Sequence, residues 1–234
     1  MSKKEEKPDA LESAEVLQEK VIGIEHWIET NPRKVVGILG VLLVLAGGYF
    51  GYRYYINDQE EQAQKEMFQA ARYFEKYIDP LNDSIRLAAE GDGNSLGFRD
   101  IIDEFSGTPA ASLANFYMGV INIRQGNYKP ARLYLEDFDA NDLLVQARAY
   151  SLIGDTYMEE KDFSNAASYY ARASAYKPNK EFTPVYMMKE ALAYEKLNQN
   201  EKAIQVYEKL ISEYGDSPEA QNAKKYLARL GGQS

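Results

Sequence analysis

The sequence predicts an all-α protein in which a solenoid of helical hairpins follows a single membrane-spanning helix. One uncharged apolar run lies near the N-terminus, at residues 35–52, and its length suits a helix that crosses a bilayer. In the second half of the chain, small and aromatic residues recur at fixed offsets in units of about 34 residues, which is typical of stacked helical hairpins. The predicted division is an N-terminal segment at 1–34, a transmembrane helix at 35–53 and a repeat domain at 54–234.

The composition excludes most classes of enzyme and of nucleic-acid-binding protein. The 234 residues include no Cys and a single His, His26, so the chain lacks the residues for thiolate zinc sites, Cys nucleophiles and His-containing triads. The net charge is −9 and no run of Lys and Arg exceeds two, which disfavours binding to a phosphate backbone. Carboxylates are plentiful, but no phosphate loop, nucleophile motif or metal-ligand spacing accompanies them. We therefore predict a protein that is not an enzyme and uses no cofactor or metal.

The apolar run from Val35 to Tyr52 is predicted to be an uncleaved signal anchor. Its 18 residues carry no charge and would span about 27 Å as a helix, close to the thickness of a bilayer core. Arg33 and Lys34 precede the run and Arg53 follows it, while tyrosines at its C-terminal end suit a membrane–water interface. A cleaved signal peptide has a shorter start than the 34 residues found here, and a buried core helix is the remaining alternative.

The charges around the run predict its orientation. Two basic residues stand directly before it, whereas the single basic residue after it is followed by acidic ones, which favours a cytoplasmic N-terminus. Residues 54–234 carry a net charge of −8 and would lie on the outer side. In a bacterium this topology is that of a single-pass inner-membrane protein with a periplasmic C-terminal domain.

The segment before the membrane run has an apolar seam of its own. Apolar residues recur there at alternating spacings of four and three and end at Asn31-Pro32, which predicts one helix over about residues 10–30. The candidate seam consists of Ala14, Leu17, Val21, Ile24 and Ile28. Acidic residues on the other faces disfavour anionic lipid, so the seam is expected to pack on a partner helix or on a second copy. The alternative is a weakly amphipathic helix that lies loosely at the membrane.

Within the membrane run, Gly47 and Gly51 stand four residues apart on one helix face. Small residues at this spacing let a second membrane helix approach closely. We therefore treat the pair as a candidate surface for helix packing in the membrane.

The clearest repeat unit covers residues 147–180. Its defining residues are Tyr150, Ile153, Gly154, Tyr157, Ala166, Tyr170 and Pro178, at positions 4, 7, 8, 11, 20, 24 and 32 of the unit. This spacing is the tetratricopeptide pattern, in which Gly154 and Ala166 lie where two helices cross closely and aromatic residues fill the space beside them. Pro178 is expected to stop the second helix.

Two further units are in register with this one. In residues 112–145, Gly119, Ala131 and Leu135 take the places of Gly154, Ala166 and Tyr170. Asn residues stand at two places that usually hold aromatics, at 115 and 122, so we expect the first helix to be rotated or packed differently. Residues 184–217 form the third unit, and a closing helix follows it and ends at Gly231-Gly232.

Shorter helices are predicted between the membrane run and the first unit. Apolar spacing indicates helices over residues 59–77, 82–90 and 98–105. The polar stretch between the last two is a predicted loop, in which Ser95 is a candidate cap for the helix that follows.

The first helix of each unit is expected to line a concave binding surface, because stacked hairpins turn this helix inward. Positions 2, 5, 9 and 12 of each unit define the predicted binding face: Leu113, Phe116, Val120, Ile123, Arg148, Ser151, Asp155, Met158, Val185, Met188, Leu192 and Glu195. This face is apolar at both ends and polar at its centre, which suits unfolded or partner segments. The alternative is that the helices at 59–105 and the closing helix cover its two apolar ends.

The layout resembles the ancillary SecYEG translocon subunit family, whose domain is shared with the cell division coordinator family. Three junctions carry the likeness: FSGTPAASLA at 105–114, RQGNYKPA at 124–131 and YGDSPEA at 214–220. The resemblance implies a tetratricopeptide domain with protein partners, namely Sec translocon subunits and periplasmic chaperones or newly exported proteins. The acidic seam helix departs from this family. It is the feature that would distinguish the alternative, a scaffold for another cell-envelope complex in cell division, gliding or a dedicated secretion system.

Overall fold

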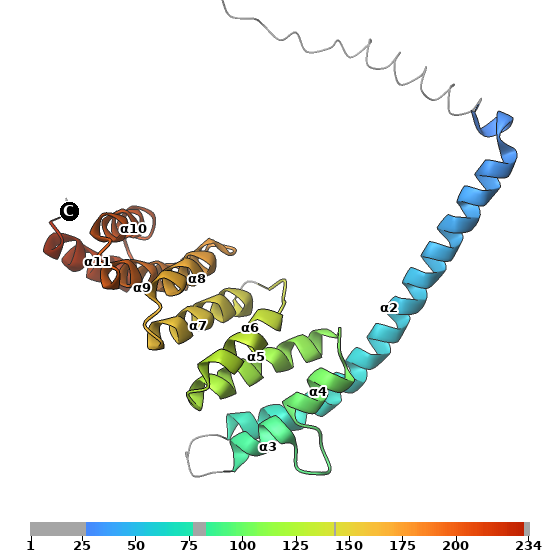
Figure 1. Cartoon of the computed structure of the whole chain (residues 1–234), viewed down its shortest axis with the longest axis horizontal. Helices are drawn as coiled ribbons and strands as arrows, with labels where there is room; N and C mark the ends of the chain where they lie inside the picture. Colours follow the sequence, from blue (N-terminus) through green and yellow to red (C-terminus); the bar gives the residue numbers. More distant parts are fainter. Residues whose placement is uncertain (1–26, 77–82, 143, 232–234) are drawn as a thin grey trace, which may run out of the picture. The chain divides into compact units, whose positions relative to one another are not determined.

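The structure is a computed structural model that describes residues 27–76, 83–142 and 144–231, and every regular element in those ranges is a helix (Figure 1). The chain divides into two units, with the boundary between Tyr55 and Ile56. The first part of α2 (Pro32–Glu75) belongs to the first unit, and the rest of α2 belongs to the second together with α3 to α11. The all-α fold class predicted from the sequence is confirmed.

Helix α2 is uninterrupted over 44 residues. It begins at Pro32, a residue favoured there because the N–H groups of a first turn have no partner within the helix. The sequence predicts a membrane helix and a separate helix from Gln59, but no Gly or Pro stands between Arg53 and Gln59, so the two are continuous. One 18-residue window of α2 has a mean hydropathy of 2.0 and no buried residue, and by length and composition α2 is able to cross a membrane.

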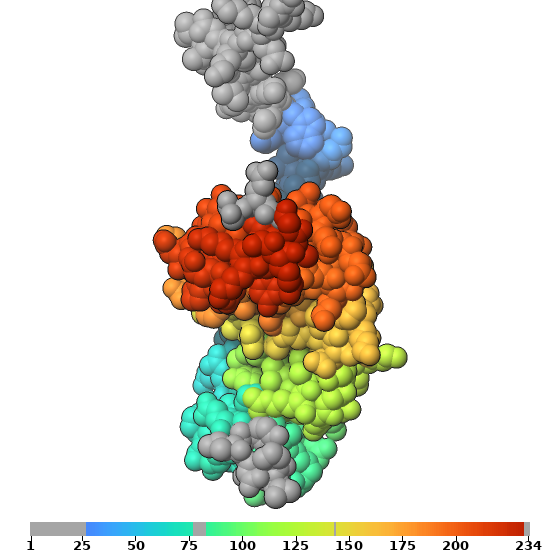
Figure 2. All heavy atoms as spheres, turned by 90° about the vertical axis from the view of Figure 1, so that its left-hand side faces the viewer, coloured from blue at the N-terminus to red at the C-terminus, as the bar shows by residue number. Residues whose placement is uncertain are grey.

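The second unit contains the three predicted hairpins, stacked in chain order (Figure 2). The paired helices are α5 (Pro109–Arg124) with α6 (Tyr128–Asp137), α7 (Val145–Glu159) with α8 (Phe163–Ala175), and α9 (Thr183–Lys196) with α10 (Asn200–Glu213). α11 (Pro218–Arg229) follows and packs on α9 and α10. Each pair matches one predicted unit, so the repeat register is confirmed.

Small residues lie where the two helices of a hairpin cross, as the pattern predicts. A Cβ atom added to Gly154 would lie 2.6 Å from Cε1 of Tyr170, and one added to Gly119 would lie 2.5 Å from Cγ of Leu135. These distances leave no room for a side chain in either hairpin. In the third hairpin, Ala191 takes the same position and is fully buried beside Tyr207.

The turn inside each hairpin has the same backbone geometry. The residues at position 15, Gly126, Lys161 and Asn198, all have positive φ angles, of 74°, 62° and 57°. In each turn the following N–H donates to the carbonyl five residues before it, as in Asp162 to Tyr157 at 2.9 Å. A Lys in this left-handed conformation shows that hairpin packing, and not the residue alone, imposes the turn.

Helix α5 is not rotated, in contrast to the expectation from its two asparagines. Gly119 faces Leu135 as Gly154 faces Tyr170. The side-chain amides of Asn115 and Asn122 are buried and donate to carbonyls one turn earlier, Asn122 at 2.8 Å. Each side-chain amide therefore finds a hydrogen-bond acceptor within its own helix, and the helix keeps its register.

The end of α2 packs against α3 (Ser84–Glu90), α4 (Phe98–Glu104) and α5. Carboxylate Oε2 of Glu60 accepts a hydrogen bond from the backbone N–H of Ala110, in the first turn of α5, at 2.8 Å. The ring of Phe74, in the last turn of α2, packs edge-on against Tyr117 of α5, with the ring centres 5.0 Å apart. One hydrogen bond and one aromatic contact thus join α2 to the first hairpin, at the start of the solenoid.

The prediction that Ser95 caps α4 is wrong. Gly97 takes the N-cap position, where an added Cβ would clash with the backbone of Gly91 and Ala89. The backbone N–H of Ser95 instead donates to Oδ1 of Asp92, which shapes the loop. Two backbone segments approach each other so closely at Gly97 that only a residue without a side chain fits there. The helix therefore begins after Gly97 and not after the hydroxyl of Ser95.

Helix α11 takes the place of the first helix of a further hairpin. Ala220, Ala223 and Leu227 are buried at the positions that correspond to 4, 7 and 11 of a unit. At the crossing position, where the other units have Gly119, Gly154 and Ala191, α11 carries the exposed Lys224. The sequence correctly predicts that this helix closes the described repeats and ends before Gly231, whose φ is 79°.

Candidate protein-interaction surface

The first part of the predicted binding face lies on α5, and its apolar residues pack into the domain. Leu113, Phe116, Val120 and Ile123 are half-buried. They lie against the buried cluster that includes Leu135, Phe138 and Ile153 of the next helices. This stripe thus contributes to the packing of α5 on α6 and α7, and only part of its area is open to a partner.

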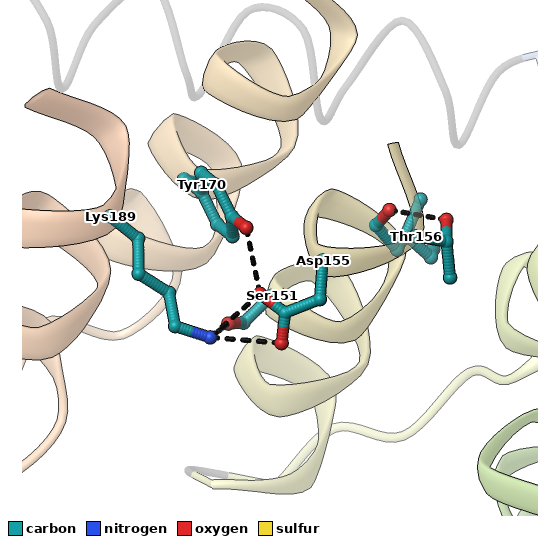
Figure 3. Close-up of polar contacts among 6 residues, drawn as sticks. Ser151, Asp155, Thr156, Tyr170 and Lys189 are labelled. Carbon is teal, nitrogen blue, oxygen red and sulfur yellow. Dashed lines mark hydrogen bonds and ion pairs between the residues drawn. The ribbon is translucent and has the colours of Figure 1, made fainter. Parts of the chain in front are cut away.

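The centre of the face is a set of paired polar groups on α7, α8 and α9 (Figure 3). Lys189 Nζ lies 2.7 and 2.9 Å from the two carboxylate oxygens of Asp155 and donates to Ser151 Oγ at 3.3 Å. The hydroxyl of Tyr170 donates to Asp155 Oδ1 at 2.7 Å. Ser151 is fully buried, whereas Lys189 and Asp155 expose about 30% of their side chains. The ion pair therefore links neighbouring repeats at the surface.

A tyrosine hydroxyl reaches the predicted face in two hairpins, but it binds different positions. Tyr170 donates to Asp155 at position 9, whereas Tyr207 donates to Glu195 at position 12, also at 2.7 Å. Burial raises the pKa of both phenols, and the neighbouring carboxylate raises it further. Both tyrosines therefore remain protonated donors over the physiological pH range.

The third part of the face lies on α9 beside α11. Val185, Met188 and Leu192 are half-buried, and Met188 lies at a cavity of about 500 Å³ that Lys225 and Arg229 also line. Arg229 forms an ion pair with Glu195. This end of the face is the one that combines half-buried apolar side chains with exposed basic groups.

The remaining residues of the face lie on α7. Arg148 is exposed, and its guanidinium lies close enough to Tyr186 to oppose the increase in the pKa of that phenol which burial causes. Met158 packs against the buried Ala166, Ala167 and Tyr170. Arg148 is thus available to a partner, and Met158 belongs mainly to the hairpin interior.

Sequence reasoning missed the partners of the charged residues on the face. Lys189 stands at position 6, outside the pattern, and only the stacking of α9 on α7 and α8 brings it to Asp155. Arg132 was missed for the same reason: its side chain is 11% exposed, and its guanidinium forms a 2.7 Å ion pair with Glu160 and donates to Thr156. The one signal in the sequence is that these cations stand close to the expected crossing positions, Arg132 directly after Ala131 and Lys189 two residues before Ala191.

Glu190 is the one acidic residue on a described repeat helix whose pKa is strongly raised. It occupies position 7 of its unit, where the second unit has the fully buried Ile153. Burial raises the pKa of its carboxyl to about 7, and the charge of Lys209 opposes this increase. The third repeat therefore carries a carboxyl that titrates near neutral pH.

The candidate membrane and N-terminal surfaces are only partly described. No atom lies within 4 Å of a Cβ added to Gly47 or Gly51, so this face of α2 is open. Of the seam residues, Ile28 is 45% exposed, and the other four lie outside the described residues. Within the described ranges, no group of three or more His, Asp or Glu side chains is placed to hold a metal ion.

Two family models of the tetratricopeptide repeat match the chain, at residues 149–181 and 186–217. The chain contains tetratricopeptide repeats. Both matches fall on the second and third hairpins, where the sequence shows the pattern most clearly. Repeats of this kind are typical of protein-interaction scaffolds and are typically not catalytic.

Solved structures with related folds were also found. One is the crystal structure of "Podosopora anserina putative kinesin light chain nearly identical TPR-like repeats", whose sequence is 13% identical to this one. The aligned region covers 75% of this chain and 85% of that chain, with a TM-score of 0.49. A single-residue variant of that protein is 14% identical, with coverages of 75% and 84% and a TM-score of 0.48. No curated protein shows a significant match to the chain.

Proposed function

We propose that this protein is a membrane-anchored, non-enzymatic scaffold that acts as an accessory subunit of the Sec translocon. In this proposal residues 35–53 are the inner-membrane anchor, residues 1–34 are cytoplasmic and residues 54–234 form a periplasmic domain. The observation that carries the proposal is that the chain joins α2, the one helix among the described residues able to cross a membrane, to a domain of tetratricopeptide repeats. The likeness of this layout to the ancillary SecYEG translocon subunit family supports the translocon as the partner.

Within the domain, the predicted binding face is the proposed site for periplasmic chaperones or newly exported proteins. Its support is the exposed Arg148 at the centre and the half-buried Val185, Met188 and Leu192 at the C-terminal end. Methionine adapts its shape to varied sequences, and partly exposed apolar side chains gain by burial against a partner. The paired charges of Asp155 and Lys189 would orient a partner that replaces one of them.

Two further contacts are proposed outside this face, one within the membrane and one on its cytoplasmic side. Gly47 and Gly51 form an open surface on α2 to which a translocon helix is able to pack closely. The seam that ends at Ile28 is the proposed cytoplasmic contact. Each surface is testable by variants that leave the repeat domain unchanged.

The test is purification of the tagged full-length protein from native membranes in mild detergent, with quantitative mass spectrometry of the proteins that co-purify. Recovery of translocon subunits in near-stoichiometric amounts supports the proposal. A Gly47→Ile/Gly51→Ile variant should reduce this recovery, whereas Gly37→Ile/Gly48→Ile, the same change on another face of α2, serves as a matched control that should not. Absence of translocon subunits together with enrichment of another envelope complex would overturn the assignment in favour of the other scaffold function.

A further inference from the structure

A cavity of about 910 Å³ lies at one edge of the repeat domain. Its walls come from the turn before α5 (106–109), from the first turn of α5 and from the loop between α6 and α7 (138–142). A volume of this order accommodates several side chains of a bound peptide. Of the predicted binding face only Leu113 lines the cavity, so it is a second surface, which we call the edge cleft.

The edge cleft has an apolar interior. Ile102, Leu113 and Val145 are half-buried in its walls, and Phe138 is almost fully buried. The ring of Phe138 is held by Phe116, with the ring centres 5.3 Å apart. A large apolar side chain that entered the cleft would therefore remove both its own surface and that of these residues from water.

The loop that forms one wall is already fixed by hydrogen bonds. Ser112 Oγ accepts from the backbone N–H of Asp139 at 2.9 Å and donates to the carbonyl of the same residue at 2.8 Å. Oε1 of Gln146 accepts from the N–H of Ala140 at 2.7 Å. Because its backbone groups are occupied, the loop is preorganised, and what it offers a ligand is its side chains.

The side chains at the rim are acidic. Asp137, Asp139 and Asp142 line the cleft, and no Lys or Arg is among the described residues that line it. Oδ1 of Asp142 accepts from the N–H groups of Leu144 and Val145, while its Oδ2 is buried with no hydrogen-bond partner among the described residues.

The Lys side chain that contacts this loop, Lys177, binds Asn141 and forms no ion pair with the aspartates of the cleft among the described residues. Lys177 Nζ donates to the carbonyl of Asn141 at 3.1 Å and to its Oδ1 at 2.6 Å, and Lys177 does not line the cleft. Three carboxylates and several apolar side chains thus line the same cleft, and its described lining includes no Lys or Arg. This combination is complementary to a cation carried next to an apolar group.

We propose that the edge cleft binds an extended peptide segment in which a large apolar side chain stands next to Lys or Arg. The apolar side chain fills the interior against Leu113 and Phe138, and the cation forms charge-assisted hydrogen bonds with the aspartates at the rim. The inference rests on the proposed role of the domain in protein binding and defines the chemistry of one partner. The net charge of −8 over residues 54–234 adds a long-range attraction for such segments.

The test uses the full-length protein in detergent and a short fluorescein-labelled peptide of alternating Leu and Lys, with binding followed by fluorescence anisotropy. Two matched peptides replace every Lys by Glu or every Leu by Ser. The Leu-Lys peptide should bind at least about tenfold more tightly than either, and its affinity should fall as salt is added.

Variants locate the binding to the cleft. Asp137→Asn/Asp139→Asn should weaken the Leu-Lys peptide by about tenfold or more, since both side chains are exposed and their loss removes the rim charge. Glu208→Gln/Glu213→Gln removes the same charge from exposed positions on α10 and should leave the affinity unchanged. Ser106→Trp, at an exposed position in the wall, should block the cleft sterically.

Equal binding of the Lys and Glu peptides, an equal effect of the two double variants, or no binding of any peptide would overturn the inference. Co-purification from membranes separates this outcome from failure of the proposed function. If translocon subunits are recovered but no peptide binds, the cleft inference fails and the proposed function stands. If the Leu-Lys peptide binds in the expected way but no translocon subunit is recovered, the cleft inference stands and the proposed function fails.

Discussion

Replacing Gly154 by Leu should strongly destabilise the central hairpin. A Cβ at this position would lie 2.6 Å from Cε1 and 2.8 Å from Cδ1 of Tyr170, about 1 Å closer than carbon atoms normally approach. The ring has little freedom to retreat, because its hydroxyl is held by Asp155 at 2.7 Å. The substitution therefore has to displace the tyrosine and its hydrogen bond together.

The expected cost follows from these two effects. Overpacking a buried site costs about 1–3 kcal/mol, and losing a hydrogen bond to a charged acceptor costs about 1.5–3 kcal/mol. Together they reduce the free energy of unfolding by about 2.5–6 kcal/mol, a large fraction of the stability of a typical domain. Gly154→Ala should cost less, since Ala191 and Tyr207 already coexist in the third hairpin, where the hydroxyl binds Glu195 instead.

The assay is urea unfolding of the full-length protein in detergent, followed by tyrosine fluorescence and circular dichroism. The control is the same Gly154→Leu change in a Tyr170→Leu background, in which the cost should shrink because the ring that obstructs the new side chain is gone. An unfolding midpoint of Gly154→Leu equal to that of the wild type would show that the repeat register and the crossing at Gly154 are wrong.

Three further predictions concern charged groups of the domain. Glu190→Gln should leave the free energy of unfolding unchanged at acidic pH and increase it by up to about 3 kcal/mol above neutral pH. The reason is that the folded carboxyl has a pKa of about 7, so the stability of the wild type falls as pH rises from about 4.5 through 7. Unfolding midpoints of both proteins over this pH range test the prediction, and a difference that does not change with pH would contradict it. Lys189→Met should lower the free energy of unfolding by about 1–3 kcal/mol, since Asp155 then loses its cation in a half-buried site, and Lys129→Met, at an exposed position, should have little effect in the same denaturation assay. Glu60→Gln should cost about 1 kcal/mol by weakening the acceptor for the Ala110 N–H, and hydrogen exchange of the first turn of α5 should speed up; unchanged exchange would contradict the role of Glu60 as a cap.

The parts of the fold that the sequence predicts are those that local geometry demands. Gly154 and Gly119 are required because a large side chain of the facing helix packs directly on each of them. That side chain follows at a fixed offset, so the hairpins are predictable from the sequence. The helix ends are predicted for the same reason, since Pro and Gly act within their own turn.

The parts that the sequence does not predict depend on neighbours far along the chain. Ser95 has the chemistry of a cap, but the approach of Gly91 to Gly97 decides where α4 begins. The pairing of Asp155 with Lys189 depends on how far one hairpin rotates on the next, and no local pattern encodes that angle. The edge cleft arises likewise from two loops whose residues give no periodic signal.

The exposed Lys224 of α11 has a consequence for how copies of this protein behave when they are crowded together. Each hairpin has a small residue where its two helices cross, and this is the feature that lets the second helix pack closely on the first. A repeated head-to-tail contact between separate molecules would produce an open-ended filament. The long charged side chain of Lys224 at this position of α11 disfavours the close approach of such a second helix from another copy, so we do not expect molecules to join end to end through this contact.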